Sequence, residues 1–276
     1  DKVEQLPYVI GDFVWTAMDY LGEAGIGSAA IRANGDQSMF QDWPWFNGWC
    51  GDLDLIGQKK PQSYYRDVVW RRAPITMAIE RPIPSGMHQS ISAWGWQLEQ
   101  QSWTYPDLKA TDRMTVNVYS RAPRVRLYLN GQRIGEQTPG STYWTGFSVG
   151  YQPGTLRAVN VDASGRELTD ESFELRTTGD PVGLRLTADR STILSDGRDL
   201  AYVTIELVDA DGQVITSNSE LKVDLSLTGD GELLAAGSAS PNDMESFRST
   251  TPRLYNGRAL AILKSSTTSG IIRLTV

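Results

Sequence analysis

The stretch LAYVTIELVDADGQVI, residues 200–215, alternates apolar and polar side chains. Its apolar residues fall at every second position and share one face, namely Ala201, Val203, Ile205 and Leu207. Because successive side chains of a strand point to opposite faces, this period of two predicts a half-buried strand. Residues 209–212, Asp-Ala-Asp-Gly, supply turn chemistry. KVDLSLTG, ALAILKS and GIIRLTV predict further short strands, so we expect an immunoglobulin-like β-sandwich over residues 179–276.

Residues 73–178 show the same style of short strands. MTVNVYS precedes RVRLYLNGQRIGEQ, residues 124–137, in which Asn130-Gly131 is the strongest short signal for a β-hairpin. A second hairpin is predicted over Ser164-Gly165. We therefore predict a second β-sandwich, joined to the first by a linker at residues 179–181, Gly-Asp-Pro.

Residues 1–72 have a different pattern. Residues 8–15, YVIGDFVW, are a nearly continuous apolar run, which is typical of a strand buried on both faces of a parallel sheet. Residues 61–72 predict a helix with proline in its first turn. This is a single βα unit, and the rest of the chain offers antiparallel sandwiches, so we infer that the strand belongs among neighbours outside this chain. The alternative is an edge strand of an adjacent sandwich.

Composition excludes several classes of function. The 276 residues carry 26 Lys and Arg against 33 Asp and Glu, a net charge of −7, so no nucleic-acid partner is expected. No apolar run approaches the roughly 18 residues of a membrane span. Cys50 is the only cysteine and cannot form an internal disulfide, and His88 is the only histidine. We expect no metal site and no cofactor.

The loop FQDWPWFNGWCGDLDL, residues 40–55, concentrates aromatic and polar side chains that could bind a ligand. Three tryptophans and a phenylalanine fall within residues 43–49, with Asn47 among them and aspartates at positions 42, 52 and 54 on either side. Flat indole rings stack on the apolar faces of sugars, and carboxylate and amide oxygens accept hydrogen bonds from hydroxyls. The pattern indicates a site for neutral carbohydrate that includes Trp45 and Asn47. The alternative is a tryptophan-rich plug that fixes a long loop to its scaffold.

Three acidic residues, Asp12, Asp19 and Glu23, lie on or just after the predicted strand. Glycoside cleavage requires two carboxyl groups, but this spacing is not specific. The simpler expectation is that Asp19 and Glu23 bind backbone groups of the loop. Farther along the chain, Trp94 and Trp96 are predicted to share one strand face, either in a core or domain interface or, with Trp103, as a platform for glycans.

Two segments carry a resemblance to a known family. GDFVWTAMDYLGE, residues 11–23, followed by DWPWFNGWCGDLDLIGQKKPQSYYRDVVW, residues 42–70, resembles the last strand, loop and helix of the (β/α)₈ barrel in glycoside hydrolase family 2, the β-galactosidase/β-glucuronidase family. The later parts resemble the sandwiches that follow the barrel. The resemblance covers nearly the whole chain and implies a mainly β fold: two immunoglobulin-like β-sandwiches, residues 73–178 and 179–276, preceded by a βα remnant of a TIM barrel, residues 1–72.

The resemblance implies a retaining mechanism with two catalytic glutamates. Both belong to motifs of earlier barrel strands; this chain has no Asn-Glu pair and no nucleophile motif, so it is expected to be inactive alone. Trp15 matches the floor of the subsite for the cleaved sugar, Asn47 matches a nearby loop position, and Trp45, Asp19 and Glu23 are further substrate-binding candidates.

The expected partners are a carbohydrate substrate, bound through the complete barrel, and the amino-terminal part of the same enzyme. The resemblance implies that this enzyme is a β-galactosidase and favours a periplasmic or secreted location for it, although the chain opens without a signal-peptide pattern. Two other functions stay open: a non-catalytic carbohydrate-binding module and a purely structural one.

Overall fold

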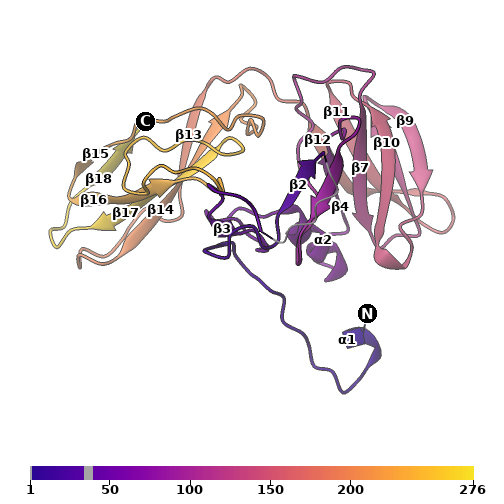
Figure 1. The fold of residues 1–276 in the computed structure, drawn as a ribbon, viewed down its shortest axis with the longest axis horizontal. Helices are drawn as coiled ribbons and strands as arrows, with labels where there is room; N and C mark the ends of the chain where they lie inside the picture. The colour runs from indigo at the N-terminus through magenta and orange to yellow at the C-terminus, as the bar shows by residue number, and fades with distance from the viewer. Residues whose placement is uncertain (1, 34–39) are drawn as a thin grey trace.

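The structure is a computed structural model that describes residues 2–33 and 40–276. β-Sheets lie at its two ends, and the amino-terminal third lies between them, with a tail that leads away from the body (Figure 1). The helices are short: α1 (Lys2–Gln5), α2 (Pro61–Val69) and the 3₁₀ helix η1 (Gly140–Thr142). The mainly β fold predicted from the sequence is confirmed.

Two four-stranded antiparallel sheets form the middle of the chain. One has the order β10-β7-β4-β6 and the other β12-β11-β8-β9. The bounds are β4 (Ile75–Glu80), β6 (Glu99–Gln100), β7 (Arg113–Ser120), β8 (Arg124–Leu129), β9 (Gln132–Gln137), β10 (Trp144–Gly150), β11 (Thr155–Val161) and β12 (Glu167–Arg176). Their inward residues form one hydrophobic core that includes Met77, Trp103, Val116, Leu127 and Leu156.

The predicted hairpin between β8 and β9 is confirmed. Asn130 and Gly131 have φ angles of 51° and 78°, the left-handed values that a two-residue hairpin turn requires and that asparagine and glycine adopt most readily.

The carboxyl-terminal sheets enclose a second core. One sheet has the order β13-β14-β17-β16, and β15 pairs with β18. The bounds are β13 (Gly183–Ala188), β14 (Leu200–Val208), β15 (Ser226–Gly229), β16 (Gly231–Gly237), β17 (Arg258–Ser265) and β18 (Ile272–Thr275). The alternation in β14 is as predicted, since Val203 and Ile205 are buried while Tyr202 is exposed. This core also includes Leu254 and Ala261.

Short strands tie the amino-terminal part to the rest. β1 (Tyr20–Leu21) pairs with β3 (Asn47–Gly48), and β2 (Ala29–Arg32) pairs with β5 (His88–Ile91) from the middle of the chain. Helix α2 starts at the predicted proline but ends at Val69, before residue 72. Its buried Val68 packs with Ala78 and Tyr119 of the middle part.

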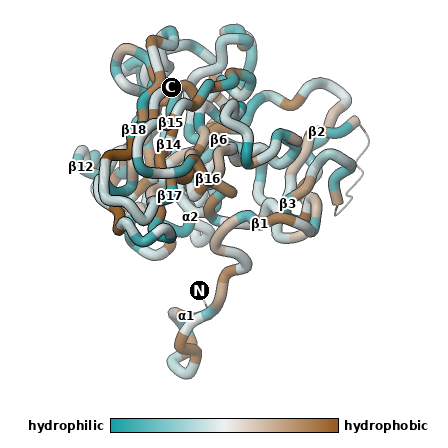
Figure 2. Tube along the Cα trace, turned by 90° about the vertical axis from the view of Figure 1, so that its left-hand side faces the viewer, coloured by the Kyte–Doolittle hydropathy of each residue, from teal (hydrophilic) through white to brown (hydrophobic). Residues whose placement is uncertain are grey.

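The apolar run 8–15 is where expectation and structure differ most. No strand forms there; Ile10 and Phe13 are each 104% exposed, and the segment lies in the tail (Figures 1 and 2). A strand needs backbone partners, and within residues 2–33 and 40–276 no strand pairs with this segment.

The expectation that Trp94 and Trp96 share a strand face is wrong. Both lie in the irregular segment after β5. Trp94 has a φ angle of 59° and is 63% exposed, whereas Trp96 packs against Tyr65 and Tyr119. The glycine between them and the turn that follows Ile91 break the alternation that a strand would need.

None of the helices in the described ranges has the length and apolarity to cross a bilayer.

Candidate functional site

Asp19 lies in a buried ion pair at the start of α2. The Lys60 amine lies 2.8 and 3.1 Å from the two carboxylate oxygens of Asp19, and the Gly51 N–H donates to the same carboxylate at 2.8 Å. Lys60 also lies over the Trp49 ring, 4.3 Å from its centroid. Burial raises the pKa of Asp19 and lowers the pKa of Lys60, and each partner opposes that shift in the other. Asp19 therefore joins three segments of the loop.

Backbone hydrogen bonds hold the segment after Trp15 beside the tryptophan-rich loop. The Asp52 N–H donates to Thr16 O at 2.9 Å, and the Asp19 N–H donates to Leu53 O at 2.9 Å. Trp15 itself is 63% exposed and meets the Tyr20 ring edge to face, with centroids 6.3 Å apart. The Trp15 indole is thus exposed to solvent, while the backbone that follows it is held by hydrogen bonds to the loop.

Glu23 lies next to the same aromatic pair. The Tyr20 hydroxyl donates a hydrogen bond to Glu23, and this bond raises the pKa of Tyr20 to about 12. Glu23 is exposed and has a φ angle of 47°. The structure therefore groups Trp15, Tyr20 and Glu23 on one surface. Asp12, the third acid, lies on the exposed tail segment.

Asn47 is wholly buried in β3, with 0% of its surface exposed. Neither its Oδ1 nor its Nδ2 has a hydrogen-bond partner among the residues that the structure describes. Its backbone oxygen, by contrast, accepts hydrogen bonds from the Trp45 indole at 2.8 Å and from the Gly25 N–H at 3.0 Å. An unsatisfied buried amide is unfavourable, so the Asn47 side chain lowers the stability of the loop as the structure has it.

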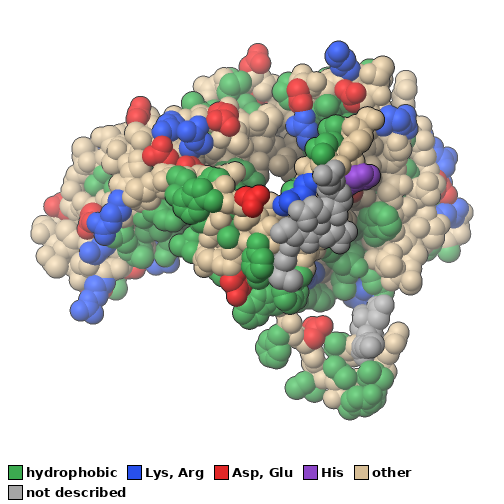
Figure 3. Space-filling view, viewed as in Figure 1, with side chains coloured by type: hydrophobic (Ala, Val, Ile, Leu, Met, Phe, Trp, Pro, Cys, Tyr) green, Lys and Arg blue, Asp and Glu red, His purple; other side chains and the backbone are tan. Residues whose placement is uncertain are grey.

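The tryptophan cluster divides into packed and exposed members. Trp45 meets Trp49 edge to face at 5.4 Å, and Trp49 meets Tyr255 of the carboxyl-terminal part at 6.2 Å. Trp43 is 75% exposed. Trp49 thus fits the alternative of a tryptophan that fixes the loop to its scaffold, whereas Trp43 does not. Figure 3 shows hydrophobic side chains gathered on the tail and on the lower face of the body beside it.

Two residues had positions that sequence reasoning did not foresee. No sequence pattern indicates that Lys60 is buried, because a lysine side chain is usually exposed to solvent. Trp103 is 0% exposed and donates from its indole to Gln152 O at 2.9 Å, so it cannot form part of a glycan platform. Cys50 is buried and free, as expected.

Comparisons with known proteins place the chain. Residues 184–276 match the family model "Glycoside hydrolase family 2 C-terminal domain 5", and residues 112–169 match a domain of unknown function, DUF4982. A β-galactosidase of Bacteroides ovatus, BoGH2A, is 25% identical over 97% of this chain and 27% of its own length. A putative β-glucuronidase of Formosa agariphila is 27% identical over 96% of this chain and 22% of its own length.

Solved structures agree. A glycosyl hydrolase family 2 member from Bacteroides cellulosilyticus superposes with a TM-score of 0.87 at 34% identity, over 99% of this chain and 35% of that one. A second member from that species gives 0.80 at 32% identity. The fold and sequence thus define a β-sandwich region of a glycoside hydrolase. The chain belongs to glycoside hydrolase family 2, as a carboxyl-terminal region, and it spans about a quarter of the length of the curated relatives it matches.

Proposed function

We propose that this chain is the carboxyl-terminal region of a retaining glycosidase that acts on β-linked carbohydrate. Residues 1–72 complete its (β/α)₈ barrel, and residues 73–178 and 179–276 are two β-sandwich domains. The observation that carries the proposal is the exposure of the apolar run 8–15, in which Ile10 and Phe13 have no contact that removes them from water. Burying such side chains is favourable by roughly 1.5–3 kcal/mol each, which a surrounding barrel would supply.

In the proposed enzyme, chemistry belongs to two glutamates outside this chain. One protonates the leaving oxygen, and the other attacks the anomeric carbon to form a covalent intermediate that water hydrolyses. This chain contributes the surface that holds the sugar. The exposed Trp15 indole stacks on the sugar, and Glu23, beside it, accepts hydrogen bonds from hydroxyls. Asn47 is buried behind this surface, so in this proposal it shapes the loop beneath the sugar and does not touch the sugar itself.

Asp19 and Trp45 act one step farther from the sugar in this proposal. The Asp19 carboxylate is engaged by Lys60 and Gly51, and the Trp45 indole N–H is engaged by Asn47 O. Both hold the loop that carries Asn47 in place. A β-galactoside is the favoured substrate, in line with the name of the Bacteroides ovatus relative.

The test compares this chain with the complete enzyme on aryl β-galactoside and aryl β-glucuronide. We expect no turnover by the chain alone, and turnover by the complete enzyme. In the complete enzyme, Trp15→Ala should lower kcat/KM by roughly tenfold or more, while Trp144→Ala, on the remote β10, should not. Turnover by the purified chain alone that a glutamate-directed inactivator abolishes would overturn the proposal.

A further inference from the structure

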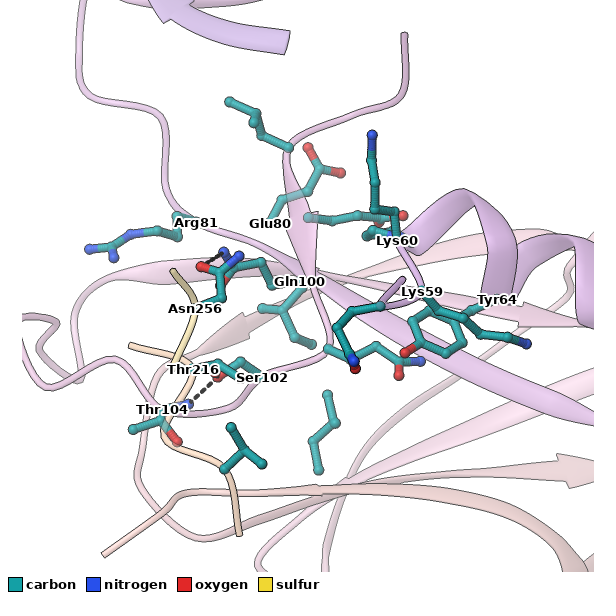
Figure 4. Close-up of a pocket in the computed structure, with 18 of the residues that line it drawn as sticks. Lys59, Lys60, Tyr64, Glu80, Arg81, Gln100, Ser102, Thr104, Thr216 and Asn256 are labelled. Carbon is teal, nitrogen blue, oxygen red and sulfur yellow. Dashed lines mark hydrogen bonds between the residues drawn. The ribbon is translucent and has the colours of Figure 1, made fainter. Parts of the chain in front are cut away.

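A cleft lies where the three parts of the chain meet, and neither Trp15 nor Asn47 lines it. Its volume is about 970 Å³, at the upper end of the roughly 300–1,000 Å³ typical of ligand sites. Its walls come from the start of α2, from residues 97–102 after β5, and from the turns at residues 211–216 and 255–258 of the carboxyl-terminal part (Figure 4).

The walls of this cleft are held at fixed positions. The Gln100 amide donates to Asn256 Oδ1 at 3.2 Å, and the Thr216 hydroxyl donates to Ser102 Oγ at 2.9 Å. Both bonds connect the middle part to the carboxyl-terminal part. The close-up shows these residues reaching toward one another at one side of the cavity, with Lys59, Lys60 and Tyr64 at the other (Figure 4). The cleft is therefore formed before any ligand binds.

The charges on the walls favour a neutral ligand. The lining includes five acidic residues (Asp54, Glu80, Glu99, Glu174, Asp211) and five basic ones (Lys59, Lys60, Arg81, Arg176, Arg258), which cancel. Every one of these basic residues already has an acidic partner: Asp67, Asp19, Asp107, Glu174 and Glu206, respectively. An anionic ligand would have to break an existing ion pair to be recognised, whereas a neutral one would not.

The uncharged side chains on the walls suit a ligand rich in hydroxyl groups. Serine, threonine and asparagine side chains line the cleft. So do seven glutamines, namely Gln58, Gln62, Gln89, Gln97, Gln100, Gln101 and Gln213. The amides of Gln58 and Gln213, on opposite parts of the chain, form no hydrogen bond with any residue in the described ranges, and neither does the Tyr64 hydroxyl. Amides both donate and accept, which matches the pairs of bonds that a sugar hydroxyl makes.

We propose that this cleft binds a neutral oligosaccharide. Its unpartnered amides bond the sugar hydroxyls, and a tyrosine of its wall, Tyr64, packs on a sugar ring. The site is separate from the barrel surface of the proposed function and needs none of the barrel. It would give the enzyme a second, non-catalytic hold on a carbohydrate chain.

The test is titration calorimetry of this chain with xylotetraose, cellotetraose and β-1,4-galactotetraose, and with tetragalacturonate as the charged comparison. At least one neutral tetrasaccharide should bind with a Kd of about 1 mM or tighter, and tetragalacturonate should bind more weakly. The double variant Gln58→Ala/Gln213→Ala should weaken that binding about tenfold. Its midpoint of thermal unfolding should not change, because no internal hydrogen bond is lost.

Two matched controls separate this site from others. Gln132→Ala, an exposed glutamine of β9, should bind as the unaltered chain does. Trp15→Ala should also leave binding unchanged; loss of binding in this variant would place the ligand on the barrel surface and overturn the cleft site. Saturable binding by none of the neutral tetrasaccharides, unaltered binding in the double variant, or preferential binding of tetragalacturonate would overturn it as well.

Discussion

Lys60 and Asp19 form an ion pair in which the side chains are 9% and 0% exposed, with 2.8 Å between Nζ and Oδ1. The pair joins the start of α2 to the segment that follows Trp15, and the Lys60 amine also donates to Trp49 O. A buried pair of this kind is tolerated because each charge neutralises the other. The pair is one of several contacts that hold the segment after Trp15 beside the loop that carries Asn47.

Removal of one partner should therefore be costly. Lys60→Met leaves the Asp19 carboxylate buried without its cation, and we expect the free energy of unfolding to fall by about 3–5 kcal/mol. Urea unfolding followed by tryptophan fluorescence measures this, since Trp49 lies against the amine. The matched control is Lys59→Met, which removes a cation from the more exposed pair with Asp67 and should cost at most about 1 kcal/mol. Equal losses in the two variants would contradict the account.

Asp54 should make stability depend on pH. Burial raises its pKa to about 6 from 3.8. For an acid whose pKa is raised in the folded state, stability is complete below the unfolded pKa and falls as pH rises through the folded one. We expect a loss of at most about 3 kcal/mol between pH 4 and pH 6, measured as the unfolding midpoint in urea.

The variant Asp54→Asn isolates this effect. An asparagine Oδ1 can still accept the hydrogen bonds from the Ile56 and Gln58 N–H groups, so the variant should match the unaltered chain at pH 4 and exceed its stability at pH 7.5. Asp196, whose pKa is lowered by the N–H groups of Asp199 and Arg198, is the control of opposite sign: Asp196→Asn should lose stability at pH 7.5. No gain at pH 7.5 in Asp54→Asn would disprove the assignment.

Trp103 should be a core residue and not a sugar contact. Trp103→Ala removes a fully buried indole and its bond to Gln152 O, and should cost about 3–5 kcal/mol. Trp94→Ala, at a 63% exposed position, should change stability by no more than about 0.5 kcal/mol. Thermal and urea unfolding of both variants give the comparison. A small effect at Trp103 would mean that its surroundings differ from those described.

Asp209 should hold the connection between the two sandwiches. Its carboxylate accepts hydrogen bonds from the N–H of Gly179 and, in its own turn, from those of Asp211 and Gln213. These donors lower its pKa, so its contribution is present above pH 3.8 and is lost as pH falls through the folded value. Asp209→Ala should speed proteolytic cleavage at residues 179–182, while Asp211→Ala should not. Equal cleavage rates would show that the contact does not order the linker.

The sequence predicted the elements whose signals are local. The alternation from Ala201 to Leu207, the Asn130-Gly131 turn and the proline at the start of α2 all depend on neighbours a few residues away, and all three are as expected. The misassigned strand at Trp94 and Trp96 shows the limit, because two alternating aromatics are too short a period to distinguish a strand from an irregular segment.

The site could be predicted only in part, because its geometry depends on distant pairings. The Lys60–Asp19 contact spans 41 residues, and the pairing of β2 with β5 joins Arg32 to His88. Because the partners lie far apart in the sequence, no local pattern of residues predicts either contact. The resemblance to the family rests on long motifs in a fixed order, and it is confirmed. The substrate-binding roles of Trp15 and Asn47 stay predictions, since nothing in the described residues tests them.

Amide hydrogen exchange at residues 8–15 tests the central claim most directly. We predict that these amides exchange at nearly unprotected rates in this chain, where no strand of residues 2–33 and 40–276 pairs with the segment. They should become strongly protected in the complete enzyme, where the segment becomes a barrel strand. Rates that remain equally fast in the complete enzyme would contradict the claim that this apolar segment is built to lie among parallel strands.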